Sequence, residues 1–334
     1  MCTRVLYETG NNTYLLGRCM DWSDMNIEPV WWVFPRGMNR DGGVGKDSIK
    51  WSSKYGSVII SMYNLASCDG MNEAGLAANL LYLSESEYGD PDKSKRPQIS
   101  LGALLQYILD NYKTVAEAVN AFKSDPLTVV TALAPNGKAG TAHFSVSDPS
   151  GDSAIFEYIG GKIVIHHSPE YTVMTNSPTY DQQLALNTYW ELIGGRNMLP
   201  GTITAADRFV RASYNLKSSP KYKDKEAVAA IFSQMRSIGV PLGMEDPDKP
   251  NIASTLWRSV VDHDKKRYYF ESVLNPAIFW VDFKNLNFEP GAKTVSLKLD
   301  GPDIMAGEVS ALFKPAEPFK FLAPKWAQTL EEAS

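Results

Sequence analysis

The sequence has 334 residues, of which 33 are Lys or Arg and 38 are Asp or Glu, and its formal net charge at pH 7 is −5. Charges of both signs are scattered along it, whereas a nucleic-acid-binding protein concentrates basic residues in a patch. No run of 18 or more apolar residues is present, as a membrane-spanning helix would need. The composition therefore argues against nucleic acid and membrane as partners and favours an ordinary globular protein.

The first predicted element is a β-hairpin over residues 5–22, where two apolar segments are joined by a Gly-Asn-Asn turn. Its second strand would bring Arg18 and Asp21 back to the level of Cys2. The hairpin therefore gathers three reactive side chains from a short stretch of chain.

Short apolar runs bounded by turn residues predict further strands at 31–34, 57–63, 75–83, 141–147, 153–159, 162–166, 257–261, 267–273 and 277–283. Helical spacing of apolar residues predicts helices after Ser100 and Thr114, at 180–192 and 204–216, and around 228–235. The polar stretch 84–97 is expected to be a loop, and the chain beyond 283 to wrap the surface. Strand blocks alternating with helix blocks indicate an α+β protein. Because no repeat or linker interrupts them, we expect a single domain over residues 2–334.

The three cysteines, Cys2, Cys19 and Cys68, are too few for a disulfide framework. The four histidines show no zinc-ligand spacing with them, so the sequence predicts no metal and no cofactor. Cys19 and Cys68 lie in apolar, strand-like runs and are expected to be small buried side chains.

Cys2 directly follows Met1, so removal of Met1 leaves a thiol and a free α-amine on one residue. An N-terminal amine titrates at roughly 7.7–8.0 and can accept a proton near neutrality. A thiolate is a strong nucleophile, and an adjacent base activates it. Arg18 would stabilise the thiolate and Asp21 would orient the amine, although a surface ion pair between the two is the alternative. The pattern predicts a catalytic unit confined to the start of the chain.

Several motifs follow one another in order: Cys2-Thr3-Arg4, Gly17-Arg18 with Met20-Asp21-Trp22, Phe34-Pro35-Arg36-Gly37-Met38, Ser53-Lys54-Tyr55-Gly56-Ser57-Val58, Asp69-Gly70-Met71-Asn72-Glu73-Ala74-Gly75-Leu76, Thr175-Asn176-Ser177-Pro178, Leu199-Pro200-Gly201 and Arg208-Phe209-Val210-Arg211. Together they resemble the choloylglycine hydrolase family of N-terminal-nucleophile hydrolases, which contains conjugated bile-salt hydrolases and penicillin V acylases. The resemblance runs from Cys2 to about Phe283. It implies a four-layer αββα sandwich.

The resemblance also implies roles for individual residues. Cys2 would be the nucleophile and its α-amine the general base, with Arg18 and Asp21 beside it. Asn176 would donate its side-chain amide to the oxyanion, together with a main-chain N–H in the segment around Tyr82.

Arg208 would lie behind the nucleophile and support the thiolate and the tetrahedral intermediate. From the residues alone, Asn176 could be a turn residue before Ser-Pro and Arg208 a surface helix residue. The implied reaction is amide hydrolysis through a thioester, and it requires processing of Met1.

Aromatic side chains at Trp22 and Tyr82 are expected to bind a flat apolar acyl group. Together with the short stretch 181–199 and the Trp-rich stretch 31–35, they resemble the Gram-negative-type cluster of penicillin V acylases. A bile-salt hydrolase, an acyl-homoserine-lactone acylase and a non-catalytic ligand-binding relative are the alternatives.

The expected partner is a small acyl-amide substrate, and the resemblance implies a homotetramer. The sequence as written carries no signal peptide, which predicts a cytoplasmic protein. If a leader has been replaced by Met1, the expected location is the periplasm.

Overall fold

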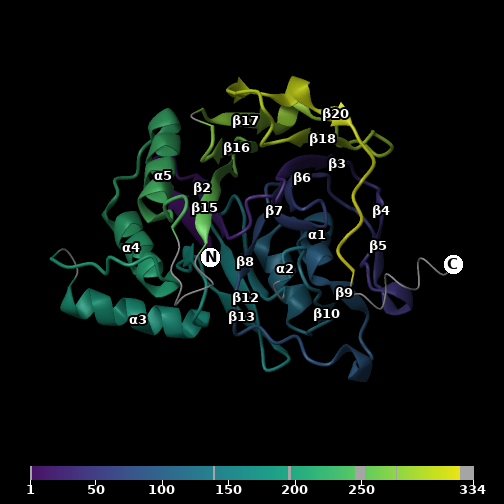
Figure 1. Cartoon of the computed structure of the whole chain (residues 1–334), viewed down its shortest axis with the longest axis horizontal. Coiled ribbons are helices and arrows are strands. Elements are labelled where there is room, and N and C mark those ends of the chain that lie inside the picture. The colour runs from purple at the N-terminus through teal and green to yellow at the C-terminus, as the bar shows by residue number, and fades with distance from the viewer. Residues whose placement is uncertain (1, 138–139, 195–196, 245–252, 276, 324–334) are drawn as a thin grey trace.

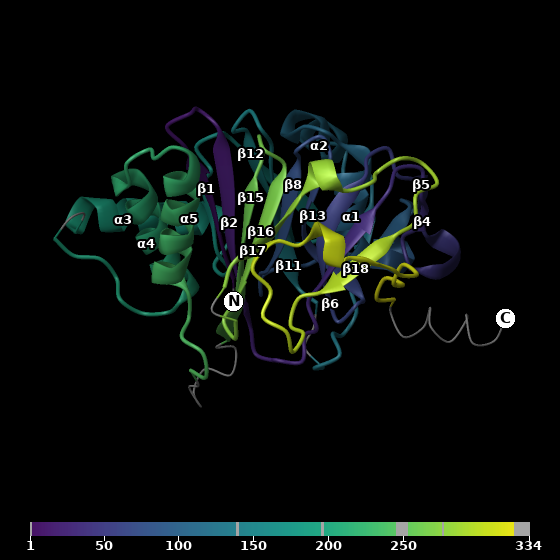
Figure 2. The ribbon, with the colours of Figure 1, turned by 90° about the horizontal axis from the view of Figure 1, so that it is seen from above.

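The computed structural model describes residues 2–137, 140–194, 197–244, 253–275 and 277–323. Two β-sheets lie face to face, and helices cover the outer side of each (Figure 2). The protein is therefore the four-layer αββα sandwich expected from the sequence. None of the helices in these ranges is long and apolar enough to cross a membrane.

Within the described residues, the first sheet has seven strands in the order β14 (Val173–Met174), β1 (Cys2–Glu8), β2 (Tyr14–Trp22), β15 (Ser254–Asp262), β16 (Arg267–Ser272), β17 (Phe279–Asp282) and β19 (Gly307–Glu308). Its outer side is covered by α3 (Tyr180–Ile193), α4 (Ala205–Ser218) and α5 (Asp224–Ile238) (Figures 1 and 2). The predicted hairpin is confirmed as β1 and β2.

The strand register of this hairpin determines which site residues face the second sheet and which face the helices. Cys2 lies opposite Met20 and Thr3 lies opposite Cys19. Side chains alternate along a strand, so Cys2, Arg18 and Met20 share the face toward the second sheet. Thr3, Cys19 and Asp21 share the face toward the helices.

The second sheet has nine strands in the described part of the chain, in the order β13 (Lys162–His167), β12 (Ser153–Ile159), β11 (Ala142–Ser147), β8 (Ala77–Tyr82), β7 (Ala66–Asn72), β6 (Ser57–Met62), β3 (Val30–Phe34), β18 (Val295–Lys298) and β20 (Lys314–Pro315). Its outer side is covered by α1 (Leu101–Asn111) and α2 (Val115–Phe122) (Figure 2). Two small pairs join β4 (Asn39–Asp41) to β5 (Lys50–Ser52) and β9 (Gln98–Ser100) to β10 (Thr128–Val130). Short 3₁₀ turns occur at Gly45–Asp47, Pro91–Lys93, Phe283–Asn285 and Ser310–Leu312.

The chain beyond residue 283 differs from the expectation that it only wraps the surface. β18 pairs with β3 and extends the second sheet, with Val295 opposite Val33. This strand was not predicted because it is short and partly exposed, so its apolar pattern is weak.

Strand alternation builds two separate cores. Along β3, Trp31 and Val33 enter the core between the sheets, whereas Val30, Trp32 and Phe34 enter the core beneath α1 and α2. Each such side chain stabilises the fold by about 1.5–3 kcal/mol. The core between the sheets continues around the first sheet to the side chains of α4 and α5, including Phe209 and Phe232, and so surrounds the hairpin carrying Cys2.

The helical spacing of the buried residues in α4 places Arg208 on the face of the helix that points inward. Its N-cap is Thr204, whose side chain accepts a hydrogen bond from the Asp207 backbone N–H. Its buried positions include 205, 208, 209 and 212, the spacing of one helix face. Arg208 therefore lies in the stripe that packs on the first sheet.

Candidate active site

Cys2 opens β1 at the edge of a cavity between the sheets. The residue is 3% exposed and lines this cavity together with Arg18 and Met20 of β2. Cys19 and Cys68, by contrast, are fully buried thiols, as the sequence predicts. Met1 lies outside the described residues.

Arg18 lies between the sulfur and a buried carboxylate. Its Nη2 is 3.5 Å from the Cys2 Sγ and donates to the Leu80 carbonyl at 3.1 Å, and its Nη1 is 2.8 Å from Asp69 Oδ2. Burial opposes the charge, but the Asp69 carboxylate and the Cys2 thiol raise the pKa of Arg18 above its ordinary value. The guanidinium therefore stays charged beside the sulfur.

Burial raises the pKa of Asp69 to about 6, although Arg18 and a hydrogen bond from Asn79 Nδ2, at 2.9 Å, act in the opposite direction. Asp69 is fully buried on β7 of the opposite sheet. The sulfur of Cys2 thus faces an ion pair formed across the two sheets.

Asn176 contacts the backbone nitrogen of Cys2. Its side-chain Oδ1 accepts from Cys2 N at 2.6 Å and from Arg208 Nη2 at 2.8 Å. Its Nδ2 donates to the Tyr82 carbonyl at 2.6 Å. The side chain therefore bridges the start of β1, helix α4 and the end of β8.

Arg208 and Asp21 form a second buried pair, on the helix side of β1. Arg208 Nη1 donates to the Cys2 carbonyl at 2.6 Å and to the Thr3 hydroxyl, and it lies 3.6 Å from Asp21 Oδ2. Asp21 Oδ1 accepts from the Thr255 hydroxyl at 2.6 Å. Burial raises the pKa of Asp21, while Arg208 and Thr255 lower it.

Aromatic side chains form part of the cavity wall. Trp22 and Tyr82, the two predicted binding residues, both line the cavity. Trp22 Nε1 donates to the Tyr63 hydroxyl at 2.8 Å, and this hydroxyl donates to Asp24 Oδ2 at 2.7 Å. Tyr63 has a φ of 53°, which is uncommon for an aromatic residue, so its backbone lies in the left-handed region.

The rest of the cavity wall is mostly apolar. The cavity has a volume of about 110 Å³, and its further lining residues are Met62, Leu65, Ala66, Leu80, Leu81, Leu101, Gly102, Thr131, Ala132, Ala134, Pro135, Gly140, Thr141, Ala142 and Leu322. Leu322 comes from the end of the described chain, where its N–H donates to the Leu65 carbonyl at 2.6 Å. A small number of polar groups in a mostly apolar cavity is typical of a small-molecule site.

All five predicted catalytic residues therefore lie together, joined by direct contacts. Sequence reasoning missed Asp69, Thr255, Tyr63 and Leu322. Asp69 belongs to one of the motifs that carry the family resemblance, but the motif alone assigns it no catalytic or binding role. The other three carry no local signal, because each reaches the site through tertiary packing.

Three comparisons with known proteins agree with this geometry. The family model described as "Linear amide C-N hydrolases, choloylglycine hydrolase family" matches residues 2–305. The chain is 49% identical to a penicillin V acylase of Pectobacterium atrosepticum, over 96% of this chain and 92% of that protein. It is 26% identical to a bile salt hydrolase/transferase of Clostridium perfringens, over 86% of this chain and 94% of that protein.

Among solved structures, a penicillin V acylase from Agrobacterium tumefaciens superimposes with a TM-score of 0.90 at 50% identity, covering 96% of this chain and all of that one. The family model ends at residue 305, so Leu322 belongs to a segment beyond it.

Proposed function

This chain belongs to the choloylglycine hydrolase family of linear amide C–N hydrolases, and from that premise we propose that it cleaves an apolar acyl group from an amide with Cys2 as nucleophile. One observation carries the proposal: Cys2 lines an apolar cavity while Arg18 Nη2 lies 3.5 Å from its sulfur. The acyl group occupies the cavity, and its carbonyl carbon meets the sulfur.

The α-amine of Cys2 is the general base once Met1 is removed. It donates one hydrogen to Asn176 Oδ1, which lies 2.6 Å away, and its lone pair takes the thiol proton. The protonated amine then gives its proton to the leaving nitrogen, and water hydrolyses the thioester. With Met1 retained this nitrogen is an amide, which has no basicity to supply.

Asn176 supplies a donor for the oxyanion of the tetrahedral intermediate. Its Nδ2 carries two hydrogens, and the Tyr82 carbonyl uses one of them. The second hydrogen is the donor to the oxyanion, a contribution typically of about 10²–10³ in rate.

Arg18 and Arg208 have different roles in this mechanism. Arg18 stabilises the thiolate, because its Nη2 lies 3.5 Å from the sulfur and Asp69 keeps it charged. Arg208 fixes the Cys2 carbonyl and the Asn176 side chain by donating to both. Asp21, whose Oδ2 lies 3.6 Å from Arg208, is the residue proposed to orient the amine.

Penicillin V is the proposed substrate, because the relatives at 49% and 50% identity are penicillin V acylases. Its phenoxyacetyl group offers a ring to the aromatic walls at Trp22 and Tyr82. The aliphatic lining that includes Leu65, Leu101 and Leu322 favours a second candidate, a long-chain acyl-homoserine lactone. A conjugated bile salt is the third, since a relative at 26% identity is a bile salt hydrolase/transferase.

One experiment separates these substrates. Penicillin V, glycocholate and a long-chain acyl-homoserine lactone are each mixed with the wild type and with Cys2→Ser, and the released amine is measured. Amine release from penicillin V that disappears in Cys2→Ser is the expected result. Binding of a substrate without release would instead identify a non-catalytic ligand-binding relative.

A homotetramer is the proposed assembly, and the exposed side of α3 supports it. Leu186, Tyr189, Leu192 and Ile193 are 39%, 54%, 81% and 47% exposed on this helix. Such an apolar strip is typical of a surface that another chain covers. Light scattering of the wild type and of Leu192→Glu tests this, with four chains expected for the wild type and fewer for the variant.

A further inference from the structure

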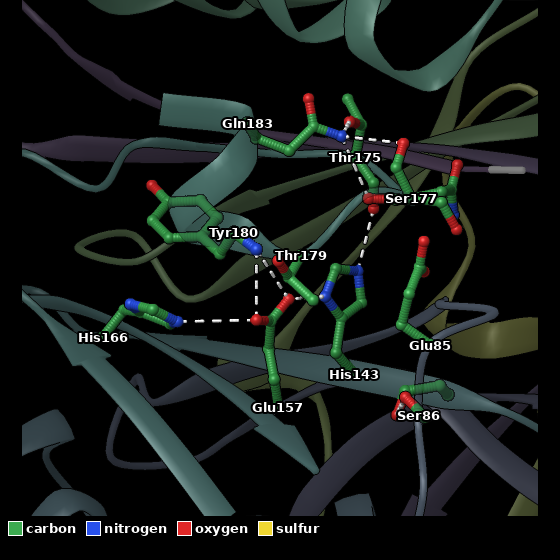
Figure 3. A network of polar contacts seen from close by, with 12 residues as sticks. Glu85, Ser86, His143, Glu157, His166, Thr175, Ser177, Thr179, Tyr180 and Gln183 are labelled. Atoms are coloured by element: carbon green, nitrogen blue, oxygen red, sulfur yellow. Dashed lines mark hydrogen bonds and ion pairs between the residues drawn. The ribbon is translucent and has the colours of Figure 1, made fainter. Parts of the chain in front are cut away.

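A buried histidine and a buried glutamate face each other next to the segment that carries Asn176 (Figure 3). His143 on β11 and Glu157 on β12 are each 1% exposed at the side chain, and Nδ1 lies 2.9 Å from Oε1. His166, on β13, reaches the other carboxylate oxygen at 3.5 Å. None of these three residues belongs to the site described above.

The contacts of His143 fix the number of protons in the pair. Its Nε2 lies 2.9 Å from the Thr175 carbonyl, which can only accept, so Nε2 carries a hydrogen. The contact between Nδ1 and Glu157 needs a second hydrogen. The pair therefore consists either of an imidazolium and a carboxylate or of a neutral imidazole and a carboxylic acid.

Further donors around Glu157 favour the ionised form. The Tyr180 N–H lies 3.1 Å from each carboxylate oxygen. Burial opposes ionisation, but the hydrogen bond from His143 and the nearby His166 lower the pKa of Glu157 to about 2. With Glu157 ionised, His143 is an imidazolium that donates from both ring nitrogens.

This pair holds both ends of the segment from Thr175 to Tyr180 (Figure 3). His143 binds the carbonyl at one end and Glu157 binds the N–H at the other. Between them, Gln183 Nε2 donates to the carbonyl of Asn176 at 3.1 Å. The backbone on which the Asn176 side chain stands is thus fixed from the second sheet and from α3.

We propose that His143, kept doubly protonated by Glu157, is a positioning residue for the reaction, because it fixes the Thr175 carbonyl and thereby the Asn176 side chain beside the Cys2 nitrogen. The inference rests on the proposed function. Asn176 Oδ1 contacts that nitrogen at 2.6 Å, a distance that tolerates little movement of the segment. A misplacement of about 1 Å can lower a rate by about 10².

A matched pair of variants tests the role. His263 is a second fully buried histidine, bound to the Gly75 carbonyl at 2.7 Å and to the Ser147 hydroxyl at 3.2 Å, without contact to the segment. We expect His143→Ala and His263→Ala to lower the melting temperature alike. His143→Ala should also lower kcat on the order of 10²-fold with KM within about threefold, because it misplaces a group without removing substrate contacts. His263→Ala should keep kcat within about threefold of the wild type.

A conservative variant separates positioning from folding. In Glu157→Gln the amide NH2, in place of Oε1, can donate to a neutral His143 Nδ1, and the amide oxygen, in place of Oε2, can accept from the Tyr180 N–H, so both ends of the segment keep a partner. We expect kcat within about fivefold of the wild type for Glu157→Gln and a loss like that of His143→Ala for Glu157→Ala. Equal kcat in His143→Ala and His263→Ala would overturn the inference.

Nitrogen-15 NMR of histidine-labelled protein reads the proton count directly. The His143 signals, assigned by their loss in His143→Ala, should show two protonated ring nitrogens in the wild type and one in Glu157→Gln. A single protonated nitrogen in the wild type would overturn the inference. Absence of amide hydrolysis by the wild type would instead count against the proposed function, so the two failures are distinguishable.

Discussion

Thr255→Val tests the part of the site that sequence reasoning missed. The Thr255 hydroxyl donates to Asp21 Oδ1 at 2.6 Å and accepts from the Val240 N–H at 2.8 Å, and the residue is fully buried. Valine has a similar volume but lacks the hydroxyl, so both groups lose their bond without a large cavity forming. A hydrogen bond to a charged group contributes about 1.5–3 kcal/mol and a buried unpaired N–H costs about 1–3 kcal/mol. We therefore expect a loss of about 3–5 kcal/mol in the free energy of unfolding.

The same substitution should act on activity through Asp21. Loss of the Thr255 bond raises the pKa of Asp21 further and frees its carboxylate to move, which weakens the proposed orientation of the Cys2 amine by Asp21. We expect kcat for amine release to fall about tenfold, which corresponds to about 1.4 kcal/mol in the barrier.

The pH dependence of this effect follows from the sign of the shift. Burial raises the pKa of Asp21 in the folded protein above its value in the unfolded chain. Asp21 therefore favours folding most at low pH, and this contribution is lost as the pH rises from the unfolded pKa through the raised one. The charged part of the Thr255→Val loss should therefore be greatest above the raised pKa of Asp21 and disappear when Asp21 is protonated. Thr255→Ser keeps the hydroxyl and is the control. Urea unfolding curves and kcat values that are the same for valine and serine would refute the reasoning.

Three further outcomes are expected. Mass spectrometry of active protein should show loss of Met1, and protein that retains Met1 should release no amine, because the Cys2 nitrogen is then an amide; full activity with Met1 present would contradict the amine-base assignment. Leu322→Ala should raise KM for penicillin V about fivefold by removing apolar wall, whereas Leu312→Ala, at a position 47% exposed, should leave KM unchanged; equal KM values would show that Leu322 does not touch substrate. Glu157 has its pKa lowered to about 2 from 4.5, so it should contribute about 3 kcal/mol that is present above pH 4.5 and lost as pH falls toward 2. Urea unfolding of the wild type at pH 5 and about pH 2.5 should show this loss and Glu157→Gln should not, and parallel curves for the two proteins would count against it.

Local patterns were enough to predict most of the fold. The hairpin of β1 and β2, and the starts of α1 and α2 at Ser100 and Thr114, follow from short stretches of sequence, and the structure confirms them. β18 was missed because it is short and partly exposed, so its sequence carries only a weak apolar pattern.

The same division applies to the site. Arg18 and Asp21 could be placed beside Cys2 from the hairpin alone, since strand register brings them there. Asn176 and Arg208 contact Cys2 from 174 and 206 residues away, and only the resemblance pointed to them. His143 stands alone in a strand, so its sequence environment carries no signal of the pair that it forms with Glu157.

The two buried ion pairs around Cys2 are better explained by the proposed reaction than by a contribution to the stability of the fold. Arg18 with Asp69 and Arg208 with Asp21 are each at most 1% exposed at the side chain, and apolar residues in place of such pairs are often neutral or stabilising. Strand alternation puts the two pairs on opposite faces of the first sheet: Arg18 and Asp69 lie beside the sulfur, and Arg208 and Asp21 lie beside the Cys2 main chain. In the proposed mechanism Cys2 supplies both the nucleophile and the base, and these two groups need different electrostatic environments. On strand β1 the side chain of Cys2 points toward the second sheet, whereas its backbone carbonyl is contacted by Arg208 from the helix layer, so the two groups have different neighbours.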